Sequence, residues 1–185
     1  MRRLFYARAT GAAVGLFAGL FTLVAVLDPV PRLIWNASAS APIGLYRVRP
    51  VDRVRRGDLV AVAPPERLAA FLAARGYLPE GVPLLKHVVA LPGQLVCRTA
   101  ARVTVDGRLI AIAREADRLG RPLPSWQGCR RLAGDELFLA NPDVPDSMDG
   151  RYFGPLPAGT VIGRATPLWV DPPAQPASPP QPQES

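Results

Sequence analysis

The chain contains one lysine and one histidine, which limits the chemistry that its side chains can supply. Lys86 is the only lysine among 22 basic residues, and His87 directly follows it. One histidine and two distant cysteines, Cys97 and Cys129, make a poor zinc site, so we expect neither a metal nor another cofactor. A Ser-His-Asp triad would have to be built on His87.

Charged residues are missing from residues 9–27, ATGAAVGLFAGLFTLVAVL. At ~1.5 Å per residue, a helix of this length nearly spans the ~30 Å hydrocarbon core of a bilayer. The stretch is longer than the apolar region of roughly 7–15 residues in a cleavable signal peptide. We therefore expect a retained transmembrane anchor, with cleavage after the segment as the alternative. Because Arg2, Arg3 and Arg8 precede it, residues 1–8 are expected in the cytoplasm and the rest of the chain beyond the inner membrane, in the periplasm.

The net charge of +7 is not accompanied by a nucleic-acid-binding motif. The arginines are scattered, and RVRPVDRVRR at residues 47–56 is their densest stretch. No zinc-finger, helix-turn-helix or aromatic RNA-binding pattern occurs with them, so we expect no nucleic-acid partner. Anionic lipid headgroups next to an anchored domain would account for the sign of the charge as well.

The two cysteines are consistent with an exported domain. In an oxidising compartment Cys97 and Cys129 would pair, and closing a loop of about 33 residues would stabilise the fold by roughly 3–4 kcal/mol in the chain-entropy description. Two buried free thiols are the alternative.

Short strands dominate the sequence between the anchor and the C-terminal tail. The expected strands are 58–63, 84–91, 94–99, a hairpin at 102–113 with Asp106-Gly107 as its turn, 136–140 and 160–170. One short helix is expected within 64–77, where a proline start, apolar spacing and a late glycine agree. The sequence thus predicts a mainly β domain at residues 28–170, a folded-over sheet or open barrel. Residues 171–185 are proline-rich without large apolar side chains, and we expect them to be disordered.

Lys86 lies in the apolar run LLKHVVALPG, which begins at Leu84. Burial can lower a lysine pKa by roughly 3–5 units, so a neutral Lys86 could act as a general base, a role closed to arginine. Alternatively, Lys86 is the one lysine left by an arginine-biased composition, and its ammonium group reaches the surface. Neighbouring residues of a strand point to opposite faces, so a site built on Lys86 excludes a triad built on His87.

A base requires a nucleophile, and two serines occur in the segment NASASAPIGLY just after the anchor. Pro42 and Gly44 predict a tight turn there that would expose the short side chains of Ser38 and Ser40. A serine hydroxyl beside a neutral lysine is a known variant of activated serine chemistry. The alternative is that both serines are ordinary turn residues.

The order of these segments resembles that of bacterial type I signal peptidases. An apolar anchor, SASAPIGLY, RGDLVAV, LLKHVVALPG and SMDGRYFGP follow one another along the chain. The form SxPxGLY, with RGYL before the lysine segment and a cysteine pair after it, resembles the conjugative-transfer signal peptidases of the TraF type more closely than it resembles the housekeeping leader peptidases. The resemblance implies a signal-peptidase-like β fold and a membrane-anchored serine endopeptidase. Its implied substrate is an exported precursor, a conjugative pilin, which some such enzymes also cyclise.

The resemblance implies a role for each of three residues in the reaction. Ser40 would be the nucleophile and Lys86 the general base. The Ser40 backbone N–H and the Ser38 hydroxyl would hold the oxyanion.

The resemblance also implies a supporting set. Ser147 would orient the lysine, and Asp149 and Arg151 would form a structural ion pair. The segment departs from leader peptidases in that NPDVPD stands where they have a GDN run, and Gly150 stands where a serine is common.

Two other functions remain compatible with the sequence. The first is an inactive, membrane-anchored assembly component of a conjugation or secretion apparatus that keeps the fold without the chemistry. The second is a housekeeping type I signal peptidase with many exported substrates. A self-cleaving Ser-Lys repressor is disfavoured by the anchor and by the missing DNA-binding region.

Overall fold

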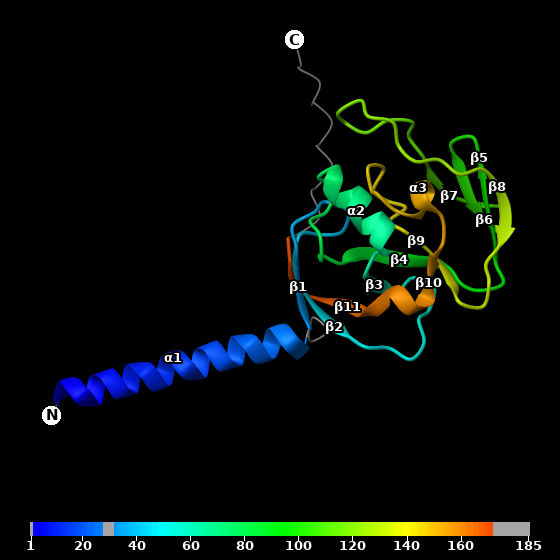
Figure 1. Ribbon diagram of the computed structural model, residues 1–185. Helices are drawn as coiled ribbons and strands as arrows, with labels where there is room; N and C mark the ends of the chain where they lie inside the picture. Colours follow the sequence, from blue (N-terminus) through cyan, green and yellow to red (C-terminus); the bar gives the residue numbers. More distant parts are fainter. Residues whose placement is uncertain (1, 28–31, 172–185) are drawn as a thin grey trace, which may run out of the picture. The chain divides into compact units, whose positions relative to one another are not determined.

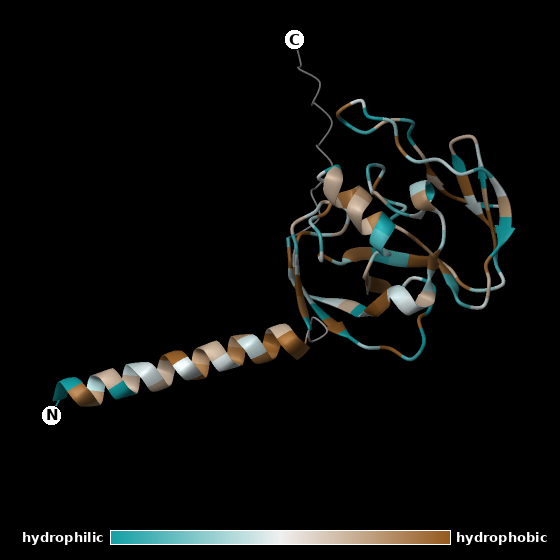
Figure 2. Ribbon diagram, in the orientation of Figure 1, coloured by the Kyte–Doolittle hydropathy of each residue, from teal (hydrophilic) through white to brown (hydrophobic). Residues whose placement is uncertain are grey.

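The computed structural model describes residues 2–27 and 32–171, which belong to two compact units, Met1–Pro31 and Arg32–Ser185 (Figure 1). The first unit contains helix α1 (Arg2–Leu27), which begins ahead of the apolar stretch expected from the sequence. Its mean hydropathy reaches 2.1 over 18 residues, and Figure 2 colours most of the helix as hydrophobic. None of its residues is buried within the protein. Such a helix is typical of a membrane anchor or a signal sequence. The expected disordered tail lies outside the described residues, except for Asp171.

The second unit is built on a seven-stranded antiparallel sheet that curls into a half-barrel (Figure 1). In order across the sheet, its strands are β1 (Leu33–Asn36), β2 (Gly44–Arg49), β11 (Val161–Val170), β3 (Leu59–Val62), β4 (Leu84–Ala90), β9 (Glu136–Ala140) and β10 (Leu156–Pro157). Strand β4 lies between β3 and β9, so its backbone is paired along both edges, and His87 is its one residue that is not fully buried.

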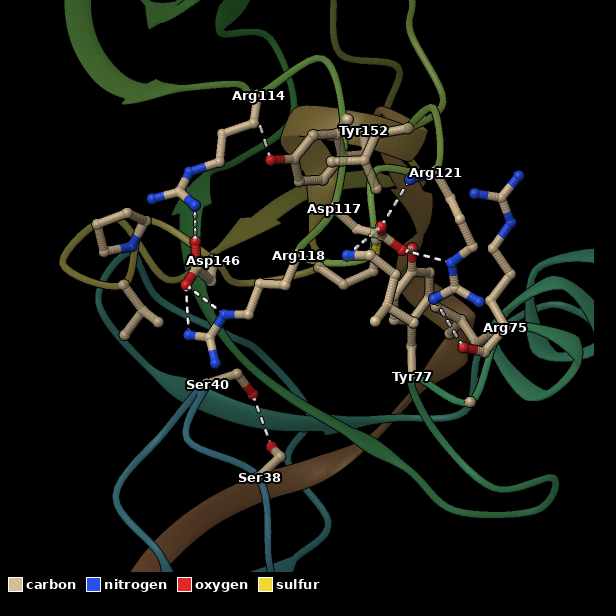
Figure 3. Close-up of a pocket in the computed structure, with 18 of the residues that line it drawn as sticks. Ser38, Ser40, Arg75, Tyr77, Arg114, Asp117, Arg118, Arg121, Asp146 and Tyr152 are labelled. Carbon is tan, nitrogen blue, oxygen red and sulfur yellow. Dashed lines mark hydrogen bonds and ion pairs between the residues drawn. The ribbon is translucent and has the colours of Figure 1, made fainter.

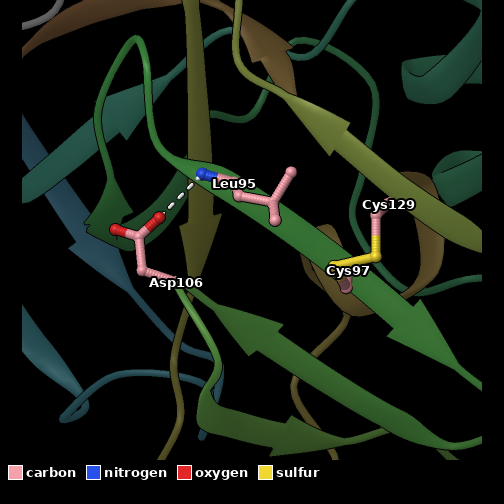
Figure 4. Close-up of a disulfide and its surroundings, with 4 residues drawn as sticks. All are labelled: Leu95, Cys97, Asp106 and Cys129. Atoms are coloured by element: carbon pink, nitrogen blue, oxygen red, sulfur yellow. Dashed lines mark hydrogen bonds between the residues drawn. A yellow bond between two sulfur atoms is a disulfide. The ribbon is translucent and has the colours of Figure 1, made fainter.

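A four-stranded antiparallel sheet forms the rest of the β structure. Its order is β7 (Arg108–Ile112), β6 (Arg102–Val105), β5 (Leu95–Thr99) and β8 (Gly128–Arg131). The predicted hairpin is confirmed: Asp106 and Gly107 have φ angles of 48° and 79°, as a two-residue turn between twisted strands requires. The predicted disulfide is also present, joining Cys97 of β5 to Cys129 of β8 (Figure 4).

Helices are few and short in this unit. They are α2 (Glu66–Ala74), α3 (Gly150–Phe153) and a 3-10 turn, η1 (Ala158–Thr160). Leu72 of α2 packs into a buried cluster with Val60, Val88 and Leu139 from the central strands, so α2 covers the sheet next to β4. A second cluster lies where the two sheets meet and includes Phe138.

The mainly β fold predicted from the sequence is confirmed, with four strands (β1, β2, β8 and the two-residue β10) and one helix that the sequence analysis did not anticipate. Strands β1 and β2 flank the serine segment, and all four residues of β8 are exposed, which leaves β8 without an apolar pattern. Helix α3 is a single turn, so its four residues carry no helical periodicity. Its N-cap is Asp149, whose side chain accepts a hydrogen bond from the Arg151 backbone N–H.

Candidate active site

The segment with the two serines is a loop between the paired strands β1 and β2, held by the side chain of Asn36. The Asn36 amide nitrogen lies within hydrogen-bond distance of the carbonyls of Ser38 (2.9 Å), Ala41 (3.0 Å) and Pro42 (3.0 Å), which share its two hydrogens. Its Oδ1 accepts from the backbone N–H of Ser38 at 3.1 Å, an Asx turn. The Tyr46 hydroxyl donates to Pro42 O at 2.7 Å. The loop is therefore fixed from inside.

The two serine hydroxyls contact each other. Ser38 Oγ and Ser40 Oγ are 2.9 Å apart. Figure 3 shows the two hydroxyls pointing toward each other. The Ser38 hydroxyl also lies 3.0 Å from Asn36 Oδ1. Because a hydroxyl has a single hydrogen to donate, Ser38 can donate to only one of these neighbours at a time.

Lys86 is buried at the centre of the seven-stranded sheet. Its register partner on β3 is Val60, and the side chain is only 2% exposed. The ammonium nitrogen donates to Ser147 Oγ at 3.0 Å.

The pKa of Lys86 lies at about 8, below the ordinary 10.5, chiefly because the amine is buried. The Asp149 carboxylate opposes this shift, and the Arg151 charge acts in the same direction as burial. At a pKa of about 8, roughly one lysine in ten is neutral at pH 7, against about one in 2,500 for a solvated lysine.

The residues expected to support the site form a buried ion pair. Arg151 Nε lies 2.8 Å from Asp149 Oδ1, and the two side chains are 1% and 0% exposed. Arg151 also donates to the carbonyl of Asn141 at 2.8 Å and to that of Pro145 at 3.1 Å. These bonds fix the segment on both sides of Ser147, which itself is 2% exposed.

Steric crowding explains why position 150 is a glycine. A Cβ atom there would lie 2.8 Å from Leu139 O and 2.9 Å from Cε2 of Phe138, so the backbone of α3 packs directly on β9. The serine expected from the resemblance would not fit this packing.

Two cavities meet at Ser40. The first, of about 590 Å³, is lined by Ser38, Ser40 and Lys86 among others. The second, of about 790 Å³, is lined by Ser40, His87 and Asn141 among others. Lys86 and His87 thus line different cavities, as neighbours on a strand should, and Ser40 lines both.

Charged side chains surround the first cavity in two groups, one on each side of the view in Figure 3. In one group, Asp146 forms ion pairs with Arg114 and Arg118. In the other, Asp117 accepts hydrogen bonds from the Tyr77 hydroxyl and from Arg121 Nε. Chiefly because of the bond from Tyr77, the pKa of Asp117 lies well below its usual value.

The structure brings Ser38, Ser40, Lys86 and Ser147 together, and places Asp149 and Arg151 behind them. The Ser40 hydroxyl is hydrogen-bonded to the Ser38 hydroxyl, and the Lys86 amine is hydrogen-bonded to Ser147. Within residues 32–171, no hydrogen bond joins Ser40 Oγ directly to Lys86 Nζ. In the same residues we find no cluster of three or more metal-ligating side chains.

Two site residues escaped the sequence analysis, Asn36 and Asn141. They are the only asparagines in the chain, and both are buried against the serine loop. Their scarcity is the same signal that drew attention to Lys86. The spacing of Asn36 and Ser38 is also typical of an Asx turn.

Several curated proteins are similar to this chain. A conjugal transfer protein TraF from Agrobacterium fabrum (strain C58 / ATCC 33970) is 39% identical over 146 residues, which cover 73% of this chain and 81% of that protein. A plasmid transfer protein TraF from Escherichia coli is 36% identical over 69% of this chain and 77% of its own length. A signal peptidase I from Leptolyngbya laminosa is 30% identical over 60% of this chain and half of that protein.

A solved signal peptidase I from Enterococcus faecalis V583 aligns with 63% of this chain and 99% of its own, at 18% identity and a TM-score of 0.37. So low a score adds nothing to the assignment, which depends on the sequence matches. The family described as signal peptidase, peptidase S26, matches residues 3–170. The chain therefore belongs to the signal peptidase family, peptidase S26.

Proposed function

We propose that this protein is a membrane-anchored serine endopeptidase that uses Ser40 and Lys86 as a catalytic dyad. The observation that carries the proposal is the burial of the only lysine in a cavity shared with Ser40, where its pKa falls to about 8. A general base works best when its pKa lies near the working pH, and strongly shifted pKa values in a cavity are typical of functional sites. Membership of the signal peptidase family supports the same chemistry.

In the proposed reaction, Ser40 Oγ attacks the scissile carbonyl while neutral Lys86 Nζ takes the hydroxyl proton. The tetrahedral intermediate then collapses, its C–N bond breaks, and Lys86 returns the proton to the leaving amine. The acyl group remains as an ester on Ser40. A water molecule, deprotonated by Lys86, hydrolyses that ester and restores the enzyme. Ser147 Oγ, 3.0 Å from Lys86 Nζ, would orient the amine throughout.

The oxyanion would be bound by the Ser40 backbone N–H and the Ser38 hydroxyl. Ser38 now lies within hydrogen-bond distance of Asn36 and Ser40, so its hydroxyl would turn toward the oxyanion as Ser40 becomes acylated. The buried pair of Asp149 and Arg151 would hold the segment of Ser147 in place. Losing one oxyanion donor typically costs ~3–4 kcal/mol of transition-state stabilisation.

The proposed substrate is an exported precursor protein, specifically a conjugative pilin. Its support is the similarity to proteins named for conjugal and plasmid transfer. The precursor would bind as an extended strand beside the serine loop, with a small side chain in the first cavity. The ester could be resolved by water, which gives cleavage, or by the amino terminus of the pilin, which gives a ring. The proposed location is the inner membrane, with α1 as a single-pass anchor and the peptidase unit on the periplasmic side.

The test is to incubate the purified full-length protein in detergent with the pilin precursor of the same conjugation system and to read the products by mass spectrometry. We expect a processed pilin, and an acyl-enzyme mass on the peptide that contains Ser40. A Ser40→Ala protein should give neither. A ring is distinguished from a linear product by its mass, which is lower by one water.

Two results would favour the other functions. An intact precursor with every pilin tested, and wild-type mating by a Ser40→Ala strain, would indicate an inactive assembly component. Loss of growth on deletion, rather than loss of mating alone, would indicate a housekeeping signal peptidase.

A further inference from the structure

Asn141 is the residue that follows β9, and it is 3% exposed. Its side chain uses its full hydrogen-bonding capacity. The amide nitrogen donates to the carbonyls of Ser40 and Leu85, the latter at 3.1 Å. Oδ1 accepts from the His87 backbone N–H at 3.1 Å and contacts His87 Nδ1 at 3.0 Å.

These partners fix the orientation of the Asn141 amide. Two carbonyl oxygens face one end, so that end must be the nitrogen, and a backbone N–H faces the other end, so that end must be the oxygen. His87 Nδ1 must then carry a hydrogen and donate it to Oδ1. A flipped amide would place oxygen against two carbonyls and nitrogen against an N–H group.

The main chain of Asn141 contacts the supporting ion pair. Its N–H donates to Asp149 Oδ2 at 2.9 Å, and its carbonyl accepts from Arg151 Nη2 at 2.8 Å. Asn141 thus bonds to the peptide of Ser40, 101 residues away in sequence, to the residues on both sides of Lys86, and to the ion pair.

The side chains of Ser40 and Lys86 make no direct hydrogen bond in the described unit, so their separation depends on how their backbones are held. Lys86 is held by its pairing with Val60 of β3, and on the other edge the pairing of β4 with β9 begins at the next residue, His87. Ser40 lies in a loop, and the bond from Asn141 to its carbonyl joins that loop to β4 and β9.

We infer that Asn141 is a positioning residue that sets the Ser40 peptide, with its nucleophile and its oxyanion N–H, at the working distance from Lys86. This inference rests on the proposed function of the dyad. A misplacement of about 1 Å can cost on the order of 10²-fold in rate without weakening substrate binding. Losing Asn141 should therefore lower kcat and leave KM nearly unchanged.

The test uses full-length Asn141→Ala in the precursor assay. We expect kcat to fall about 100-fold, KM to stay within about threefold, and the rise of kcat/KM with pH to keep its midpoint, because the surroundings of Lys86 are otherwise retained. The matched control is Gln94→Ala, which removes side-chain hydrogen bonds to Leu91 and Asp106 away from the cavities. It should keep its kcat.

A second variant covers the case in which Asn141→Ala does not fold. His87→Ala removes only the ring that donates to Asn141 Oδ1, at a partly exposed position, and should lower kcat about 3- to 10-fold. A kcat within twofold of the wild type in whichever of the two variants folds would overturn the inference. Failure of the proposed function looks different: the wild type itself would not cleave, or Ser40→Ala would remain active.

Discussion

The burial of Lys86 makes a substitution by arginine informative. If Lys86 were a structural cation, Lys86→Arg would keep the charge and much of the function. If it is a base, Lys86→Arg should be as inactive as Lys86→Ala, because a guanidinium with a pKa above ~12 has no neutral form to offer at pH 7. The measurement is precursor cleavage by each variant, with circular dichroism as the folding control. A folded Lys86→Arg protein with near wild-type turnover would rule out the dyad.

The same burial predicts the pH dependence of the wild type. Catalysis needs the neutral amine, so kcat/KM should rise with pH, pass its midpoint at about 8, the pKa of Lys86, and level off above it. Steady-state assays between pH 6 and 10 would measure it. A profile that is flat over this range would contradict the assignment of Lys86 as the base.

Lys86 should also lower the stability of the fold. Below pH 8 both the folded and unfolded states hold the proton, and the folded state bears the full cost of a buried charge. Between about 8 and 10.5 the folded state gives up its proton first, so its free energy of unfolding rises with pH. Lys86→Met should therefore be more stable than the wild type at pH 7, by about 1–2 kcal/mol after allowing for the hydrogen bond lost by Ser147. Urea unfolding should show that the stability difference between Lys86→Met and the wild type is smaller at pH 10.5 than at pH 7.

The two serines of the loop should respond differently to alanine. Ser40→Ala should abolish processing, because the nucleophile is gone. Ser38→Ala should leave an enzyme slower by 10²- to 10³-fold, because the backbone oxyanion donor remains. Single-turnover assays of the two variants decide the assignment. If Ser40→Ala keeps activity and Ser38→Ala loses it entirely, the two roles have been exchanged.

Among the secondary-structure elements, the sequence predicted those that are specified by their own residues. The hairpin of β6 and β7 follows from Asp106-Gly107, and β4 from its apolar run, since each signal is contained in the segment itself. Strand β8 has no apolar face, and it forms because β5 offers a free edge and Cys129 faces Cys97. The side-chain contacts of Asn141 are also non-local, because its partners lie on β4 and in the loop before β2. The sequence around Asn141 therefore contains no pattern that predicts them.

The disulfide should stabilise the smaller sheet without taking part in catalysis. Cys97 and Cys129 close a loop with a sequence separation of 32, and removing such a link typically costs roughly 2–4 kcal/mol. A Cys97→Ser, Cys129→Ser double variant should lose that much stability and keep kcat/KM within about twofold. Reduction of the wild type should lower its free energy of unfolding by a similar amount and lower its Tm accordingly. Alkylation without reductant should find no free thiol. A Tm that does not respond to reduction would show that the link is not formed in solution.

For the whole molecule, the charge at one end of α1 predicts which side of the membrane the peptidase unit occupies. Arg2 and Arg3 begin the helix and Arg8 follows in its second turn, whereas the opposite end, through Leu27, has no basic residue. At ~1.5 Å per residue, its 26 residues extend about 39 Å, enough to cross the hydrocarbon core with the arginines in the headgroups. From the positive-inside rule we therefore predict that the N-terminus lies in the cytoplasm and that Ser40 and Lys86 lie outside it.

Two reporters fused after Asp171 test this topology. Alkaline phosphatase, which needs an oxidising compartment, should be active there, and green fluorescent protein exported by the same route should be dark. Replacing Arg2, Arg3 and Arg8 together by glutamine should reduce phosphatase activity, because the orientation then loses its main determinant. The same change at Arg47, Arg49 and Arg53, which lie outside the helix in the sequence, should not. A fluorescent fusion with inactive phosphatase would place the unit in the cytoplasm. There a disulfide between Cys97 and Cys129 would not persist and an exported precursor would be out of reach, so this single result would count against the substrate as well as the topology.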